Sequence, residues 1–314
     1  MRAETGWPGG RKVVALITVA LELWSPGHWP AYAPMAAAWP LSGSDDTHST
    51  SWVDYGVTTG IWRLLDVLGD VPATVGVNGL VAERHPETVR AVHEAGHEVA
   101  AHSWAQDLVP ALLGADAERA SIRRCTDILR RVTGVRPAGW MSPRATGSRH
   151  TADLLAEAGY RWTGDHSDHD LPQLLSTAHG PLVSLMHSDP SDVRDAAAGP
   201  YAYRDLHREL LDQLLAAPGP GVFRLTVHAH VGGRPPLAGM VGQTLDHVRK
   251  SGDVWVATHA QVAEHVLTHQ GRTPCRGAGL CGAIHLVLVG QRGVPDRPPR
   301  RALRQQPPSL PISA

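Results

Sequence analysis

The stretch that decides the fold is VVALITVALEL, residues 13–23. It is an almost unbroken apolar run, rich in β-branched side chains, and Glu22 is the only charged residue within it. A strand with one face in water alternates polar and apolar residues, which this stretch does not do. We therefore predict a strand that is covered on both faces, as is typical of a parallel sheet packed between helices.

Similar runs return along the chain, separated by segments with helical periodicity. Strands are expected at residues 73–77, 97–102, 136–141, 160–165, 181–187, 221–230 and 253–259. Helices are expected at residues 56–69, 81–96, 116–132, 151–159, 203–216, 238–250 and 259–268. This alternation predicts an α/β fold with a parallel sheet, and seven or eight strands favour a distorted or incomplete barrel.

Two segments fall outside the alternation. Residues 24–55 are rich in Pro, Trp and Ser and too long for a simple connection, so we expect a loop that covers the strand ends and shapes a pocket. Residues 271–314 are rich in Arg, Pro and Gly, which predicts a disordered tail. We expect one barrel domain, residues 1–270, followed by this tail.

Composition excludes several classes of partner. The net charge of −1 provides no overall field that would attract nucleic acid or an anionic membrane. The three cysteines fit neither a disulfide framework nor a zinc motif, which indicates a reducing compartment and a cytoplasmic protein. A secretory signal is the rival interpretation of residues 11–33, although Glu22 interrupts its apolar core.

Residues with useful chemistry follow the predicted strands. In parallel α/β folds, ligands bind at the carboxyl ends of the strands. His102, Ser142–Arg144, Asp165, His187 and His228 all stand at such ends. They come from separate parts of the chain, and we expect the topology to gather them on one face of the barrel.

Several of these candidates also have a plainer interpretation. His228 and His230 would share one face of a strand, either as a metal pair or as packing and loop-bonding residues at the rim. Asp165 and Asp168 lie in the dense run GDHSDHD, which fits either a site or a polar surface loop. Glu22 lines a polar site or points past the strand end, since a lone buried carboxylate is costly.

The segment Trp140–Arg144 combines an aromatic wall, a rigid bend and a cation. Arg144 could steady an anionic or carbonyl-rich ligand. The plainer interpretation is a surface arginine beside a structural contact between Trp140 and Pro143.

Four stretches together resemble one family. They are HEVAAHSWAQD, GVRPAGWMSPRATGSRHTADLLAEAGYRWTGD, HSDHDLP and LTVHAHVGGRPP with DVWVATHAQVAEHV, in that order within residues 12–268. They resemble the polysaccharide deacetylase superfamily, the NodB-homology or carbohydrate esterase four type. The resemblance is strongest to the divergent branch that includes bacterial allantoinases and polysaccharide deacetylase-like proteins.

The resemblance implies a distorted (β/α) barrel with seven or eight strands and hydrolysis of amide bonds. The family's metal site uses an aspartate pair on the first strand and an H-x-x-x-H motif. Here Val19 and Ala20 stand at the aspartate positions with only Glu22 nearby, and Gln106 replaces the second histidine after His102. We therefore expect no metal cofactor, with a divalent ion held by His102, Asp165 and His228 as the alternative.

The resemblance also implies residue roles. His228 matches the late histidine that serves as general acid, Asp165 or Glu22 would be the base or orienting carboxylate, and His102 as imidazolium would polarise the carbonyl. The expected substrate-binding residues are Trp104, Gln106, Trp140, Pro143, Arg144, Asp168 and His230.

The predicted function is hydrolysis of a non-peptide carbon–nitrogen bond in a small-molecule or sugar amide, without a metal. One alternative is a metal-dependent sugar N-deacetylase with rearranged ligands. The other is an inactive barrel that binds a carbohydrate or ureide. Members of the related branch often form multimers, so the resemblance allows a homo-oligomer.

Overall fold

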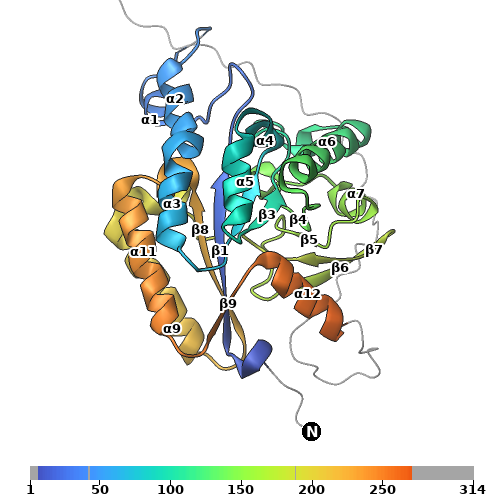
Figure 1. Ribbon diagram of the computed structural model, residues 1–314, viewed down its shortest axis with the longest axis vertical. Helices are drawn as coiled ribbons and strands as arrows, with labels where there is room; N and C mark the ends of the chain where they lie inside the picture. Colours follow the sequence, from blue (N-terminus) through green and yellow to red (C-terminus); the bar gives the residue numbers. More distant parts are fainter. Residues whose placement is uncertain (1–5, 42, 188, 271–314) are drawn as a thin grey trace, which may run out of the picture.

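A computed structural model describes residues 6–41, 43–187 and 189–270. The chain forms a strongly curled sheet with helices around its outside (Figure 1). The hydrogen-bonded strand order is β6-β7-β5-β4-β3-β2-β1-β8, and β9 pairs with β1. The strands are β1 Val13–Leu21, β2 Thr74–Val77, β3 Glu98–Ala101, β4 Gly139–Trp140, β5 Trp162–Thr163, β6 Gln173–Thr177, β7 Gly180–Ser184, β8 Gly221–His228 and β9 Val254–Ala257. The predicted distorted α/β barrel is confirmed.

Strand β1 pairs with three other strands, and every one of its residues is buried. Residues 13–20 pair with β8, while β9 and β2 share the other edge of β1. Ile17 and Val19 belong to one apolar core, and Val14 and Leu16 belong to a second core on the opposite face. Burial on both faces is the reason why this stretch shows no alternation.

The helices are α1 Pro34–Ala38, α2 Thr47–Tyr55, α3 Ile61–Leu68, α4 Gly79–Arg84, α5 Pro86–Glu94, α6 Ala115–Thr133, α7 Thr151–Glu157, α8 Asp192–Asp195, α9 Pro200–Ala216, α10 Ala229–Gly232, α11 Pro235–Lys250 and α12 His259–Gln270. Most of the helices pack on the outer face of the sheet, whereas α12 contributes Val262 and Val266 to the core on the opposite face. Helices α3 and α11 lie beside each other on the β8 side, whereas α6 and α7 flank the β3–β5 side (Figure 1).

Two predictions about helices and strands were wrong. The single helix expected at 81–96 is two helices, because Pro86 has no backbone N–H to donate and restricts His85, which is non-helical. The strand expected at 221–230 ends at His228, and His230 lies in α10. Helix α10 lies so close to Gly60, in the short helix η2 (Gly56–Gly60), that a Cβ there would overlap the Ala229 carbonyl.

The sheet has an open side that the sequence did not predict. Strands β6 and β7 form an antiparallel hairpin, and β6 and β8 are the two ends of the strand order. A single β-bridge, Ser191 to Thr226, connects β8 with the segment after β7. The predicted loop at 24–55 contains α1 and α2, and the predicted tail at 271–314 lies outside the described residues. None of the described helices is long and apolar enough to cross a membrane.

Candidate active site

Three of the expected site residues, His102, His228 and His230, meet around Glu22, directly after β1. The Glu22 side chain is fully buried, with one carboxylate oxygen, Oε1, 3.1 Å from Nε2 of His102 and 3.9 Å from Nε2 of His228. The other oxygen, Oε2, lies 3.9 Å from Nδ1 of His230. Burial alone would raise the pKa of Glu22, but the surrounding imidazoles outweigh it and lower the pKa to about 2. Glu22 is therefore ionised at neutral pH.

His228, the last residue of β8, is held by Asp192 at the start of α8. Its Nδ1–H donates to one Asp192 oxygen at 2.6 Å, and its backbone N–H donates to the other at 2.9 Å. Burial disfavours the imidazolium, yet the carboxylates of Glu22 and Asp192 outweigh this and raise the pKa of His228 to about 9. His228 is therefore a cation at neutral pH, with Nε2 on the side of Glu22.

His102 follows β3, and both of its ring nitrogens face acceptors. Nδ1 lies 2.8 Å from the carbonyl oxygen of Met141, and Nε2 lies 3.1 Å from Glu22. Because a carbonyl and a carboxylate can only accept, the imidazolium form satisfies both contacts. Asn78 connects the segments that carry Glu22 and His102. Its Oδ1 accepts the Leu23 N–H at 2.9 Å, and its side-chain amide N–H donates to the His102 carbonyl.

An aromatic collar from the 24–55 loop surrounds His230. Trp24 and Trp52 meet its ring edge-on at 5.9 and 5.1 Å, and the ring of Tyr32 stacks on it at 6.1 Å. The Tyr32 hydroxyl lies 3.1 Å from Nε2 of His230. Burial lowers the pKa of His230 to about 4, so it is neutral at neutral pH. Three aromatic residues of the 24–55 loop thus lie against His230.

Asp165, the other expected base, is bonded to a different partner. Its two oxygens accept the backbone N–H of Ser142 at 2.7 Å and the Ser142 hydroxyl at 2.6 Å. The indole N–H of Trp140 donates to that hydroxyl at 3.0 Å. Burial raises the pKa of Asp165. Asp165 therefore stabilises the bend after β4. The carboxylate that is bonded to His228 is Asp192, not Asp165.

The expected substrate-binding residues divide into two groups. His230 lies beside Glu22. Gln106 lies next to the segment that carries Glu22, since the backbone N–H of Gln106 donates to the carbonyl of the following residue, Leu23, at 3.0 Å. The ring of Trp104 lies instead between α4 and α6, under the guanidinium of Arg124 at 3.3 Å.

The remaining members of that set lie around the Asp165 bend or on the surface. Trp140 and Pro143 are buried, as expected for the plainer interpretation of this segment. Arg144 is exposed and has a left-handed backbone with φ of 61°. Asp168 is an exposed residue of the loop after β5. Among the described residues, the hydrogen bonds and ion pairs of Glu22 involve none of these four side chains.

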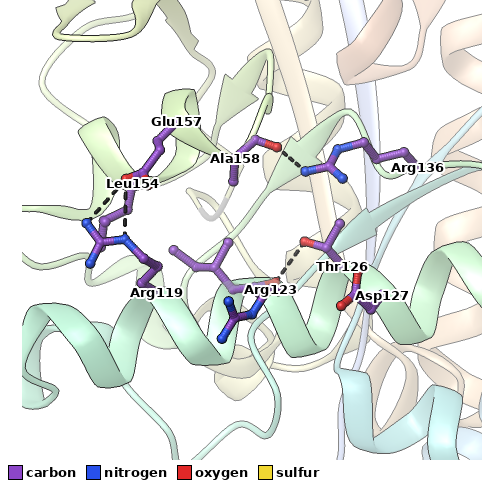
Figure 2. A pocket seen from close by; sticks show the side chains of 9 residues that line it. Arg119, Arg123, Thr126, Asp127, Arg136, Leu154, Glu157 and Ala158 are labelled. Carbon is purple, nitrogen blue, oxygen red and sulfur yellow. Dashed lines mark hydrogen bonds and ion pairs between the residues drawn. The ribbon is translucent and has the colours of Figure 1, made fainter.

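A separate hollow lies on the outside of the barrel between α6 and α7 (Figure 2). Two of its three arginines are already bonded, since Arg119 pairs with Glu157 at 3.3 Å and Arg136 donates to the Ala158 carbonyl. It shares no residue with the cluster around Glu22, so we do not include it in the candidate site.

The residues around Glu22 do not fit a divalent ion as they stand. In the alternative set of His102, Asp165 and His228, both oxygens of Asp165 are bonded to Ser142. Within residues 6–41, 43–187 and 189–270, no three His, Cys, Asp or Glu side chains form a group that could hold a metal ion. Structural and catalytic zinc sites in proteins generally use at least three such ligands.

Two residues of the site had no clear sequence signal. Asp192 belongs to a short acidic segment without periodicity, and only its position shortly after the β7 strand points to the rim. Tyr32 was one of many aromatic residues in the 24–55 loop. Both acquire their roles through contacts with His228 and His230, which lie far away in the sequence.

Comparisons with known proteins agree with the fold. Residues 45–163 match a family model described as polysaccharide deacetylase. A putative polysaccharide deacetylase from Mycobacterium smegmatis has a solved structure with 30% identity and a TM-score of 0.73, covering 87% of this chain and 96% of that one. The structure of Puue allantoinase has a TM-score of 0.77 at 24% identity, covering 85% and 94% of the two chains. A peptidoglycan deacetylase from Helicobacter pylori is 22% identical over 270 residues, 73% of this chain and 91% of that protein.

Proposed function

We propose that this chain, which belongs to the polysaccharide deacetylase family of carbon–nitrogen hydrolases, cleaves a non-peptide amide bond at Glu22 without a metal ion. The observation that carries the proposal is the buried ionised carboxylate of Glu22, which lies beside the imidazolium of His228 and the ring of His102. The similar protein from Mycobacterium smegmatis is named a putative polysaccharide deacetylase. The second similar structure is that of Puue allantoinase.

Opposite charges face each other in the site. The Glu22 carboxylate lies 3.9 Å from Nε2 of the His228 imidazolium, whose Nδ1–H is bonded to Asp192. Two buried opposite charges tolerate burial better together than either does alone. The site also presents a carboxylate and the rings of His102 and His228 at one point, and the hydrolysis of an amide requires such a combination.

Each group then has a role in the reaction. Glu22 orients a water molecule and takes its proton as the oxygen attacks the amide carbon. The imidazolium of His102 donates to the oxyanion that forms. His228 gives its Nε2 proton to the leaving nitrogen as the carbon–nitrogen bond breaks, leaving a carboxylic acid and an amine. At the end of the reaction Glu22 has gained a proton and His228 has lost one, so transfer of that proton from Glu22 to His228 returns the site to its starting state.

Asp192 is a positioning residue in this scheme. It bonds Nδ1 of His228, so the transferable proton of that ring sits on Nε2, on the side of Glu22. Of the buried groups at the centre, His228 is the most accessible, with 17% of its side chain exposed. The leaving nitrogen of a substrate would therefore meet His228 first.

The substrate classes are a sugar N-acetyl group and a cyclic ureide. Purified protein would be incubated with N-acetylated sugar oligomers, peptidoglycan fragments and cyclic ureides, and free amine or opened ring would be measured. The proposal expects turnover of one class that is absent in Glu22→Gln. Binding without turnover in the unmodified protein would instead support the inactive, ligand-binding barrel.

A further inference from the structure

Asn78, the first residue after β2, is bonded to both of the chain segments that carry the Glu22 and His102 pair. Strand β2 lies between β1 and β3 in the sheet, and the Asn78 side chain is fully buried where these strands end. Its Oδ1 accepts the N–H of Leu23, the residue after Glu22, at 2.9 Å. Its side-chain N–H donates to the backbone carbonyl of His102. One amide group therefore connects the backbone beside Glu22 to the backbone of His102.

Two backbone hydrogen bonds continue this connection, from the start of α4 to the segment after β3. The N–H of Gly79 donates to the carbonyl of Ser103 at 2.9 Å, and the N–H of Leu80 donates to the carbonyl of Trp104 at 2.8 Å. Ser103 has a left-handed backbone with φ of 59°, which a residue with a Cβ adopts only where surrounding contacts hold it. These hydrogen bonds therefore hold the turn that directly follows His102.

The distance from the His102 ring to Glu22 depends on where the backbone of His102 lies. The ring is held at both nitrogens, since Nδ1 lies 2.8 Å from the Met141 carbonyl oxygen and Nε2 lies 3.1 Å from Glu22. The backbone N–H donates to the Val77 carbonyl at 3.0 Å, and the backbone carbonyl accepts from Asn78. Without the Asn78 amide this carbonyl loses its donor, so the peptide group after His102 can rotate and carry the ring away from Glu22.

The two contacts of Asn78 require opposite hydrogen-bonding groups, and an amide offers both. The Leu23 N–H needs an acceptor, and the His102 carbonyl needs a donor. An aspartate carboxylate can only accept, and a leucine of similar size can do neither. Because an unsatisfied buried backbone group costs free energy, the chain around a changed residue 78 would shift to find another partner.

We propose that Asn78 is a positioning residue that sets the separation between the Glu22 carboxylate and the His102 ring. The proposal rests on the proposed function, in which these two groups act on one amide. The side-chain hydrogen bonds of Asn78 go only to backbone atoms, so its effect on the reaction is indirect. Loss of its amide should therefore lower kcat more than it changes KM, because displaced reacting groups weaken binding of the transition state rather than of the substrate.

The first measurement needs no substrate. Because Glu22 is ionised and can only accept, Nε2 of His102 carries a proton toward it, and this buried proton should give a downfield NMR signal in the full chain labelled with ¹⁵N-histidine. The variant His102→Gln, which lacks the ring, identifies the signal. In Asn78→Leu the signal should move upfield, or disappear through exchange with water.

Two further variants separate positioning from a general loss of stability. Thr126→Val, on α6 (Figure 2), removes a buried hydroxyl that lies 2.6 Å from the Tyr160 hydroxyl, so it should destabilise the protein and leave the His102 signal unchanged. Asn78→Asp preserves the size of the side chain and the acceptor for Leu23 if Asn78→Leu does not fold. Its ionised carboxylate cannot donate to His102, so the signal should change in this variant too.

The second measurement is turnover. Asn78→Leu should lower kcat about 10- to 100-fold and change KM less than about threefold, in the range for small displacements of reacting groups. Thr126→Val should leave both unchanged. The proposal is overturned if the His102 signal is unchanged in the Asn78 variants, if Thr126→Val changes it equally, or if the signal is lost while kcat stays the same. Absence of turnover in the unmodified protein would contradict the proposed function instead, and the NMR comparison would still test Asn78.

Discussion

Glu22, which is buried, and Asp165, which is half-buried, are both carboxylates just beyond the carboxyl end of a strand, yet their surroundings differ in kind. Both oxygens of Asp165 accept short hydrogen bonds from one residue, Ser142. Glu22 has imidazoles around it, and its Oε2 has no hydrogen-bond partner among the described residues. Position at a strand end therefore does not identify the reactive carboxylate. The partners of its oxygens distinguish a group that holds a bend from one that can act on a ligand.

The largest expected effect comes from removing the charge of Glu22. Glu22→Gln should lower kcat by about 10³-fold or more, in the range for loss of a proton-transferring group. Asp165→Asn, the matched change at the other carboxylate, should lower kcat by less than about tenfold because Asp165 does not contact the imidazolium pair. Steady-state kinetics on both variants measure the two decreases in kcat. Equal decreases in kcat would contradict the different roles assigned to Glu22 and Asp165.

The next effect concerns the pH dependence that Asp192 gives to His228. The folded-state pKa of His228 is raised from an ordinary value of 6.5 to about 9, so its proton is available below about pH 9 and lost above it. Asp192→Asn removes a carboxylate that favours the imidazolium, so the alkaline limb of kcat/KM should move to lower pH. A variant with reduced activity but an unmoved alkaline limb would show that Asp192 is merely structural.

The same raised pKa predicts a change in stability with pH. The contribution of His228 is fully present below pH 6.5 and is lost as the pH rises through about 9. Urea unfolding of the unmodified chain should therefore show a falling free energy across this window. The fall should be smaller in Asp192→Asn, and an identical fall in both proteins would contradict the assigned ion pair.

Asp165→Asn should act on stability more than on catalysis. An asparagine at this position keeps one acceptor oxygen and presents an NH₂ to a Ser142 donor, so one buried hydrogen bond is lost. We expect a decrease of about 1–3 kcal/mol in the free energy of unfolding. Chemical denaturation measures it, with the exposed Asp168→Asn as a control that should change little.

The smallest expected effect belongs to the aromatic collar. Tyr32→Phe removes the hydroxyl that lies 3.1 Å from His230 but keeps the stacked ring. Since one neutral hydrogen bond contributes about 1 kcal/mol, kcat/KM should fall less than about tenfold. A larger fall would mean that the Tyr32 hydroxyl takes part in the reaction itself.

The sequence was sufficient for the parts of the fold that depend on local pattern. The unbroken apolar run of β1 predicted burial on both faces, and the strand–helix alternation predicted the barrel and the shared rim of His102 and His228. It was insufficient where tertiary contacts override the pattern. The strand through His230 ends early because α10 packs on Gly60, and no period in the sequence encodes that contact.

The choice between carboxylates was also beyond the sequence. Asp165 and Glu22 stood as equal candidates for the base, and Asp192 was not a candidate at all. What separates them are hydrogen bonds between distant segments, such as the bond from His228 to Asp192 across 36 positions. Such pairings depend on how strand ends converge in space, which neither composition nor spacing specifies.

The central claim is that Glu22 and its imidazolium partners hydrolyse an amide without a metal ion. The most direct measurement is elemental analysis of the purified, active protein, followed by turnover assays after exhaustive chelation. The account predicts metal far below stoichiometry and unchanged turnover. Stoichiometric zinc or another divalent ion, with activity lost on chelation and restored by that ion, would contradict it.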